Sequence, residues 1–227
     1  MALVGALLYL ALGTRPDIAY VVGVLTRFMQ NPGEKHWNAA KYVLRYLKGT
    51  ADFGLRYTRT TLPTMTAAGW SDANFVDKGT CGKSTGGYVF ILLSAALSWK
   101  SKLMFIPATS TCEAEIMAIH FAACEAIWLL KGLRALGVKY FENNPMTMME
   151  DNQGCIAVTK NHKTSHRTKY IETKFFKIRT WVESGELEVQ YSSTYDMVAD
   201  IFTKALQRVT FIRHRSSLGV VRIIFRE

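Results

Sequence analysis

The order of strand-like and helix-like segments after residue 66 constrains the fold of this chain more than any other feature. Three β-rich segments come first, and a long helical segment follows them. This order predicts a five-stranded mixed sheet with helices on both faces, because a regular parallel α/β fold would alternate strands and helices throughout. The expected strands are 67–72, 87–93, 96–102, 147–149 and 187–191, and the expected helices are 110–136, 155–159, 170–184 and 196–206.

Helical periodicity describes the first part of the chain. Apolar residues recur at helical spacing from Ile18 to Phe28, and a second amphipathic segment runs from Glu34 to Gly49. On the long helix, an apolar stripe along one face is formed by Met117, Phe121, Cys124 and Trp128. The predicted division is a helical segment at 1–65, a mixed-sheet domain at 66–207 and a tail at 208–227, whose strand-like run 220–225 has no evident partner.

Charge and cysteine content narrow the class of protein. The net charge is +10, and residues 160–179 hold seven Lys or Arg and one Glu. This basic block predicts an anionic partner, although a solvated helical face explains it equally well. The four cysteines form no CxxC pair, which predicts reduced thiols and an intracellular protein. The apolar run 2–12 is too short to span a bilayer and lacks the basic region of a signal peptide, so we expect no membrane association.

Four acidic residues are candidates for chemistry, and most also have a plain structural explanation. Asp72 follows an apolar strand, where Asp commonly forms a turn. Asp151 is placed to cap the helix after it. Glu113 and Glu115 both lie in the first turn of the long helix, where the helix dipole favours carboxylates.

The fourth acid, Asp200, has no such explanation. Asp196 completes a capping pattern with Ser193, but Asp200 is expected one turn inside an apolar helix, where a carboxylate needs a cation or a metal. In a mixed sheet the first and fourth strands can be neighbours, which would bring Asp72 beside Asp151. Oxygen ligands suit Mg²⁺ or Mn²⁺, and two such ions about 3.5–4 Å apart can promote hydrolysis of a phosphodiester.

Ten short blocks along the chain match one known family. They are LVGALLYL (3–10), TRPDIAY (14–20), VLRYLKGT (43–50), SDAN (71–74), GKSTGGYVF (82–90), SWKSK (98–102), EAE (113–115), DNQ (151–153), HRTK (166–169) and ADIFTK (199–204). Together they resemble the C-terminal part of a copia-type retrotransposon Pol polyprotein, namely the end of the reverse transcriptase followed by its ribonuclease H domain.

The resemblance implies a ribonuclease H fold and hydrolysis of the RNA strand of an RNA–DNA hybrid during reverse transcription. It places the family's ligands for two Mg²⁺ or Mn²⁺ ions on Asp72, Glu115, Asp151 and Asp200. Glu115 is preferred to Glu113 because it directly precedes the Ile-Met-Ala step of the family's helix. The implied substrate-binding residues are Lys100, Lys102, Asn152, Gln153, Arg167 and Lys169. The implied partners are the hybrid and the upstream polymerase, in a cytoplasmic particle or the nucleus.

Several departures from the family pattern bear on activity. The paired aspartates of the polymerase are absent, so we expect no DNA synthesis. The 192–194 loop has no histidine, which predicts slow product release, and Tyr170 replaces a common histidine. Because Met1 falls inside the polymerase part, we expect a truncated copy, and the alternative function is a catalytically silent remnant that at most binds nucleic acid. A transposase- or integrase-like nuclease is disfavoured, because its acids follow the order Asp, Asp, Glu.

Overall fold

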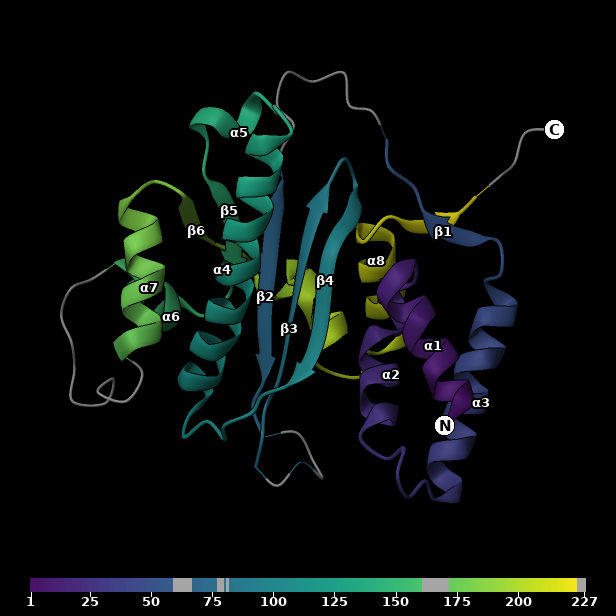
Figure 1. The fold of residues 1–227 in the computed structure, drawn as a ribbon. Helices are drawn as coiled ribbons and strands as arrows, with labels where there is room; N and C mark the ends of the chain where they lie inside the picture. The colour runs from purple at the N-terminus through teal and green to yellow at the C-terminus, as the bar shows by residue number, and fades with distance from the viewer. Residues whose placement is uncertain (59–66, 77–79, 81, 161–171, 224–227) are drawn as a thin grey trace.

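The computed structural model describes residues 1–58, 67–76, 80, 82–160 and 172–223. Its main sheet has five strands in the order β4-β3-β2-β5-β6 (Figure 1). The first three strands are antiparallel neighbours, and β5 and β6 are added in parallel on the other side of β2. The predicted mixed sheet is therefore confirmed, including the pairing of its first and fourth strands. The bounds are β2 Ala68–Asn74, β3 Thr85–Leu92, β4 Ala95–Leu103, β5 Met146–Glu150 and β6 Leu187–Tyr191.

Helix α4 (Thr111–Ala135) packs along one face of this sheet, with α5 (Tyr140–Asn143), α6 (Gln153–Lys160) and α7 (Glu172–Glu183) on the same side. Only the first half of the predicted stripe on α4 faces the core: Met117 is buried and Phe121 packs against the core, whereas Cys124 is exposed and Trp128 is 68% exposed. The buried face is instead rich in alanine, which lets the helix approach the sheet closely. By length and composition α4 could cross a membrane, but 61% of its apolar window is buried inside the molecule, as in a core helix.

The N-terminal helices share a second core with the opposite face of the sheet. Helices α1 (Ala2–Gly13), α2 (Ala19–Thr26) and α3 (Glu34–Gly49), with the 3-10 turn η1 (Pro16–Ile18), form one cluster with buried Val89 and Ala96 of the sheet. Trp99 of β4 donates a 2.8 Å hydrogen bond from Nε1 to the carbonyl of Ala11. Helices therefore cover both faces of the sheet, as expected.

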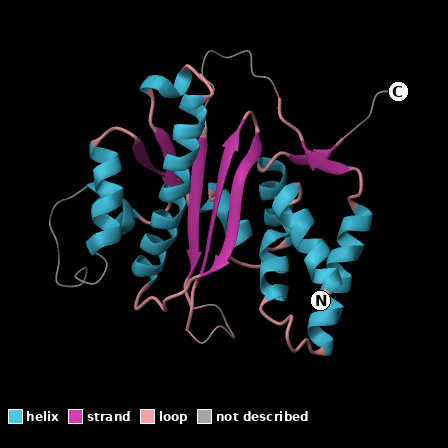
Figure 2. Cartoon of the chain, in the orientation of Figure 1, coloured by secondary structure: helices cyan, strands magenta, loops and turns pink. Residues whose placement is uncertain are grey.

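The C-terminal segment returns to these N-terminal helices. Helix α8 (Arg208–Ser217) leads into β7 (Val220–Arg222), which pairs antiparallel with β1 (Phe53–Leu55). Figure 2 shows this two-stranded sheet apart from the main one, beside α1 and α3. The run that had no evident partner in the sequence thus closes onto a strand some 165 residues earlier.

The predicted helix 196–206 is wrong. Two short 3-10 helices occupy this stretch, η3 (Thr194–Asp196) and η4 (Val198–Phe202). Side chains compete here for the carbonyls that an α-helix would use, since Ser101 Oγ donates to the Phe202 carbonyl at 2.6 Å and Thr203 Oγ1 lies 3.3 Å from the Asp200 carbonyl. Ser193 caps η3 through Asp196 as predicted.

Candidate metal centre

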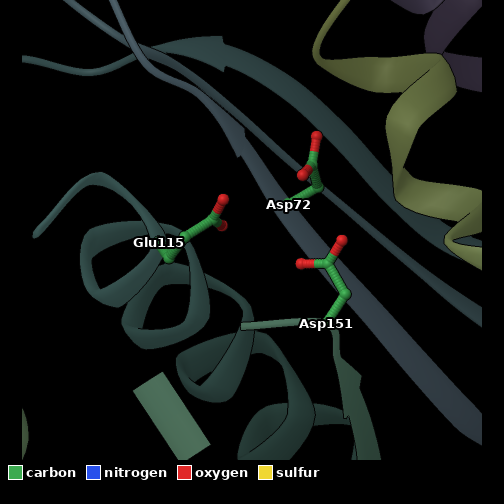
Figure 3. A group of neighbouring side chains, drawn as sticks. All are labelled: Asp72, Glu115 and Asp151. Carbon is green, nitrogen blue, oxygen red and sulfur yellow. The ribbon is translucent and has the colours of Figure 1, made fainter. Parts of the chain in front are cut away.

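Three of the four candidate acids converge at the ends of β2 and β5 and the start of α4 (Figure 3). Trp70 of β2 pairs with Met149 of β5 in parallel register, so Asp72 and Asp151 are the next residues in step on the same faces of their strands. Glu115 joins them as the fifth residue of α4. One carboxylate oxygen from each residue lies within 4.8 Å of the others.

Helix capping explains why Glu115 rather than Glu113 reaches this cluster. Ser110 caps α4 by accepting a hydrogen bond from the Glu113 backbone N–H, and the Glu113 carboxylate accepts bonds from the N–H and hydroxyl of Thr109. The two side chains thus have separate tasks: Glu113 closes the helix start, and Glu115 points to the acids.

Helix capping also distinguishes the role of Asp151 from that of the next residue, Asn152. The side chain of Asn152 accepts a 3.1 Å hydrogen bond from the Cys155 N–H and so caps α6, the role that the sequence alternatively suggested for Asp151. Asp151 is left facing the cluster and accepts a 2.9 Å bond from Thr194 Oγ1. Of the two predicted substrate contacts here, Asn152 is occupied by the cap, and Gln153 is exposed on the first turn of α6.

Asp200 is not among the three converging acids, although it lies beside them. Lys204 Nζ is 2.7 Å from Asp200 Oδ1 and 4.0 Å from Asp72 Oδ2. Thr203 donates a hydrogen bond from Oγ1 to the same Asp72 oxygen. The ammonium of Lys204 therefore stands between the Asp200 carboxylate and the three-acid cluster. Lys204 and Thr203 were missed as site residues, although both fall in the ADIFTK block.

Gly87 of β3 allows η4 to come this close to the sheet. It pairs with Asp72 across the β2–β3 ladder, and a Cβ at this position would lie 2.5 Å from Phe202 Cβ and 2.9 Å from Thr203 Cγ2. Any larger residue would push η4 outward. The glycine thus fixes the distance between Asp72 and the turn that carries Thr203 and Lys204.

The surroundings of Asp72 disfavour its negative charge. Its pKa is raised to about 6, first by burial and also by the charges of Asp200 and Asp151, while Lys204 and Thr203 act in the opposite direction. One ammonium and one hydroxyl therefore do not fully compensate the desolvation and repulsion at this carboxylate.

Glu115 is less well compensated still. Burial, followed by the charges of Asp72, Glu150 and Asp151, raises its pKa to about 10. Its Oε2 is buried and has no hydrogen-bond partner among the described residues. A buried, unpaired carboxylate oxygen facing two further carboxylates fits a divalent cation with oxygen ligands, such as Mg²⁺ or Mn²⁺.

Glu150 is a further buried acid that the sequence analysis did not single out. It is fully buried, accepts bonds from Ser71 Oγ and the Asn152 N–H, and has a pKa raised to about 8, mainly by burial. The sequence contained a pattern that could have predicted its burial. Every second residue of β5 faces inward, and Glu150 follows Met146 and Met148 in this alternation. An acid in that pattern indicates a carboxylate beneath the site.

The predicted lysine contacts lie together on one surface. Both Lys100 and Lys102 extend from exposed positions of β4 over the ring of Phe121 on α4, with Nζ 5.5 and 5.6 Å from its centroid. Their shared position on one face of the strand agrees with the sequence. The other two predicted contacts, Arg167 and Lys169, lie outside the described residues.

The order of the five strands, with acids at the ends of the neighbouring strands β2 and β5, fits the ribonuclease H-like fold that the resemblance implied. No family model matches the chain. A solved structure similar to it is the N-terminal RNase H domain of Rv2228c from Mycobacterium tuberculosis, fused to maltose-binding protein, with 11% identity and a TM-score of 0.43 over 68% of this chain and 99% of that one.

Two curated relatives match nearly the whole chain. The retrovirus-related Pol polyprotein from transposon TNT 1-94 of Nicotiana tabacum is 39% identical over 217 residues, 96% of this chain and 16% of that protein. The Pol polyprotein from transposon RE2 of Arabidopsis thaliana is 36% identical over 221 residues, 97% of this chain and 15% of that protein. The chain belongs to the retrovirus-related Pol polyproteins of copia-type retrotransposons, as its motifs predicted, and spans about one sixth of the length of these relatives.

Proposed function

We propose that this chain is a ribonuclease H that hydrolyses the RNA strand of an RNA–DNA hybrid with two divalent cations. The observation that supports this most directly is the convergence of Asp72, Glu115 and Asp151 within 4.8 Å, with a buried Glu115 oxygen that has no hydrogen-bond partner among the described residues. Such a cluster is unfavourable for a protein by itself and favourable for one that binds Mg²⁺ or Mn²⁺.

The residues divide the work by position. Asp72, Glu115 and Asp151 would hold the ions, and Asp200 would add a ligand from η4. Bound divalent cations supply a more acidic water and charge stabilisation at the phosphoryl and leaving oxygens. The chain itself keeps the carboxylates in place: Thr203 and Thr194 orient Asp72 and Asp151 by hydrogen bonds, and the Glu113 cap fixes the start of the helix that carries Glu115.

The hybrid would be held through its backbone. Lys100 and Lys102 offer two exposed ammonium groups over one aromatic ring, and Arg167 and Lys169 stay predicted phosphate contacts. Recognition through phosphates and 2′-hydroxyls needs no base-reading residues. The division into a polymerase-derived part at 1–65, a catalytic part at 66–207 and a tail at 208–227, an upstream polymerase as partner and an intracellular location belong to the same proposal.

A cleavage assay tests this function. The full chain and Asp151→Asn are incubated with an RNA–DNA hybrid labelled on the RNA strand, with Mg²⁺ and with EDTA. We expect Mg²⁺-dependent cleavage by the parent chain and a loss of roughly a hundredfold or more in the variant. Equal cleavage by both proteins would reject this site, and binding of the hybrid without cleavage by either would favour a silent remnant.

A further inference from the structure

Lys204 places its ammonium between two buried carboxylates that come from different elements. Its Nζ is 2.7 Å from Asp200 Oδ1 and 4.0 Å from Asp72 Oδ2. The carboxylates of these two acids are almost completely buried, with 9% and 6% of their side chains exposed. The ammonium is thus the positive charge that separates Asp200 from the cluster of Asp72, Glu115 and Asp151.

Thr203 and Lys204 both contact Asp72 from the turn that follows η4, but their side chains differ in mobility. Thr203 is fully buried and its hydroxyl is fixed against Asp72 by the packing of η4 on Gly87. The Lys204 side chain is 38% exposed, and four rotatable bonds connect its ammonium to the backbone. Lys204 can therefore move into solvent without unfolding the turn, whereas Thr203 cannot.

The freedom of the Lys204 ammonium to move matters because it and a second divalent ion would compete for the same carboxylates. Asp72, Glu115, Asp151 and Asp200 bring four carboxylates to one small region, and Lys204 is the cation that contacts two of them. Each residue of the three-acid cluster offers one carboxylate oxygen to one divalent ion. A second ion near Asp72 and Asp200 would have to share that region with an ammonium, and two cations so close repel each other.

We propose that Lys204 is a tethered competitor for one of the two cation positions, and that it sets how weakly the second ion binds. With one ion at Asp72, Glu115 and Asp151, the ammonium holds Asp200 and Asp72 in place. When a second ion binds between them, Lys204 moves out to solvent. This inference rests on the proposed metal centre, and it assigns to Lys204 the difference in affinity between the two ions.

Direct metal binding tests the proposal without measuring activity. Binding of Mn²⁺ to the full chain is followed by the loss of the electron paramagnetic resonance signal of free Mn²⁺, at constant ionic strength, for the parent, Lys204→Met and Lys131→Met. Lys131 is exposed on α4, about 24 Å along the helix from Glu115, so its variant controls for net charge. We expect Lys204→Met to lower the dissociation constant of the weaker ion about tenfold or more, and Lys131→Met to change it less than about twofold.

Further variants make each outcome decisive. Adding Asp200→Asn to Lys204→Met should abolish the gain, because the proposed second position then loses a ligand. Circular dichroism verifies folding, and Lys204→Gln replaces the methionine variant if that one is unfolded. Unchanged binding of the weaker ion in a folded, neutral Lys204 variant overturns this inference alone. If Asp72→Asn leaves both ions bound as in the parent, the metal centre itself is wrong.

Discussion

Among the residues that the structure describes, two buried groups of charged side chains are built on opposite principles. Between the N-terminal helices, Arg15 donates two hydrogen bonds to Asp17 and two more to Thr50, and Tyr46 donates to Asp17. At the ends of β2 and β5, three carboxylates face one another. The first group, which we call the arginine network, pairs opposite charges. The second, which we call the acid cluster, gathers like charges.

The difference separates structure from function within one chain. A buried ion pair with every group hydrogen-bonded is complete as it stands and links η1 to α3. A buried group of like charges with an unpaired oxygen destabilises the protein unless something else is bound. Removing a charge should therefore weaken the protein in the arginine network and strengthen it in the acid cluster.

The largest effect is expected for Arg15→Met. Asp17 has no exposed side-chain surface and would lose its bidentate partner, so we expect the free energy of unfolding to fall by about 3–5 kcal/mol. Urea denaturation measures it. Arg45→Met is the matched control, since Arg45 is exposed and stacks on Tyr42 at 4.8 Å, and it should cost about 0.5 kcal/mol. A loss below about 1 kcal/mol for Arg15→Met would contradict the structural role of the network.

The opposite sign is expected for Glu115→Gln. Without divalent cations at pH 8, the Glu115 carboxyl is ionised in the unfolded chain, but burial and the neighbouring acids raise its pKa to about 10 in the folded state, so it must take up a proton on folding; a neutral glutamine avoids this cost and should raise the free energy of unfolding by about 2 kcal/mol. The stabilisation that Mg²⁺ gives the parent should disappear in the variant. Glu113→Gln removes the same charge from the first turn of α4, where the carboxylate accepts bonds from Thr109, and should instead cost about 0.5–1 kcal/mol. If both variants lose stability equally, the Glu115 carboxylate stabilises the start of α4 as Glu113 does, and it is not strained by the neighbouring acids.

The acid cluster should also give stability an unusual pH dependence. The pKa of Asp72 is raised from 3.8 to about 6 on folding, so between these values the folded state binds more protons than the unfolded state. The free energy of unfolding therefore falls as pH rises through this window, by up to about 1.4 kcal/mol per unit. Urea titrations from pH 4 to 7 without divalent cations measure the slope. Glu115 and Glu150, whose pKa values are raised to about 10 and about 8, contribute in the same direction, so we expect Asp72→Asn to reduce the slope and saturating Mg²⁺ to flatten it. An unchanged slope in Asp72→Asn would assign it to the other two acids.

The sequence predicted those parts of the fold that depend on local patterns and on the order of the segments. The order of segments allowed the strands before Asp72 and Asp151 to be neighbours, and the family motif selected Glu115 over Glu113. The pairing of β1 with β7 had no local signal, because two three-residue strands far apart in the chain carry no periodicity. On α4, large residues suggested one face, whereas close packing on a sheet selected the alanines.

The positions of Asp200, Thr203 and Lys204 depend on tertiary contacts that the spacing of residues in the sequence does not predict. Asp200 was placed one turn inside an α-helix, but Ser101 and Gly87, on other strands, hold that stretch in a 3-10 conformation. The same packing brings Thr203 and Lys204 to Asp72. Thr203 and Lys204 contact Asp72 because the turn that carries them packs against strands β3 and β4. The residues next to them in the sequence do not predict this packing.

The smallest effect compares two buried threonines, one from each charged group. Thr50 accepts a 2.8 Å bond from Arg15 in the arginine network, and Thr203 donates to Asp72 beside the acid cluster. Each valine substitution removes this bond and the one that the hydroxyl donates to a backbone carbonyl, that of Tyr46 for Thr50 and that of Asp200 for Thr203, and should cost about 1 kcal/mol in the absence of divalent cations. With Mg²⁺, the cost of Thr203→Val should shrink, because a cation at Asp72 then stabilises the charge that the hydroxyl supported. The cost of Thr50→Val should not change, since Arg15 keeps its need for an acceptor whether or not metal is present. Urea denaturation of both variants with and without Mg²⁺ measures this, and equal costs for Thr203→Val in both conditions would mean that no cation binds at Asp72.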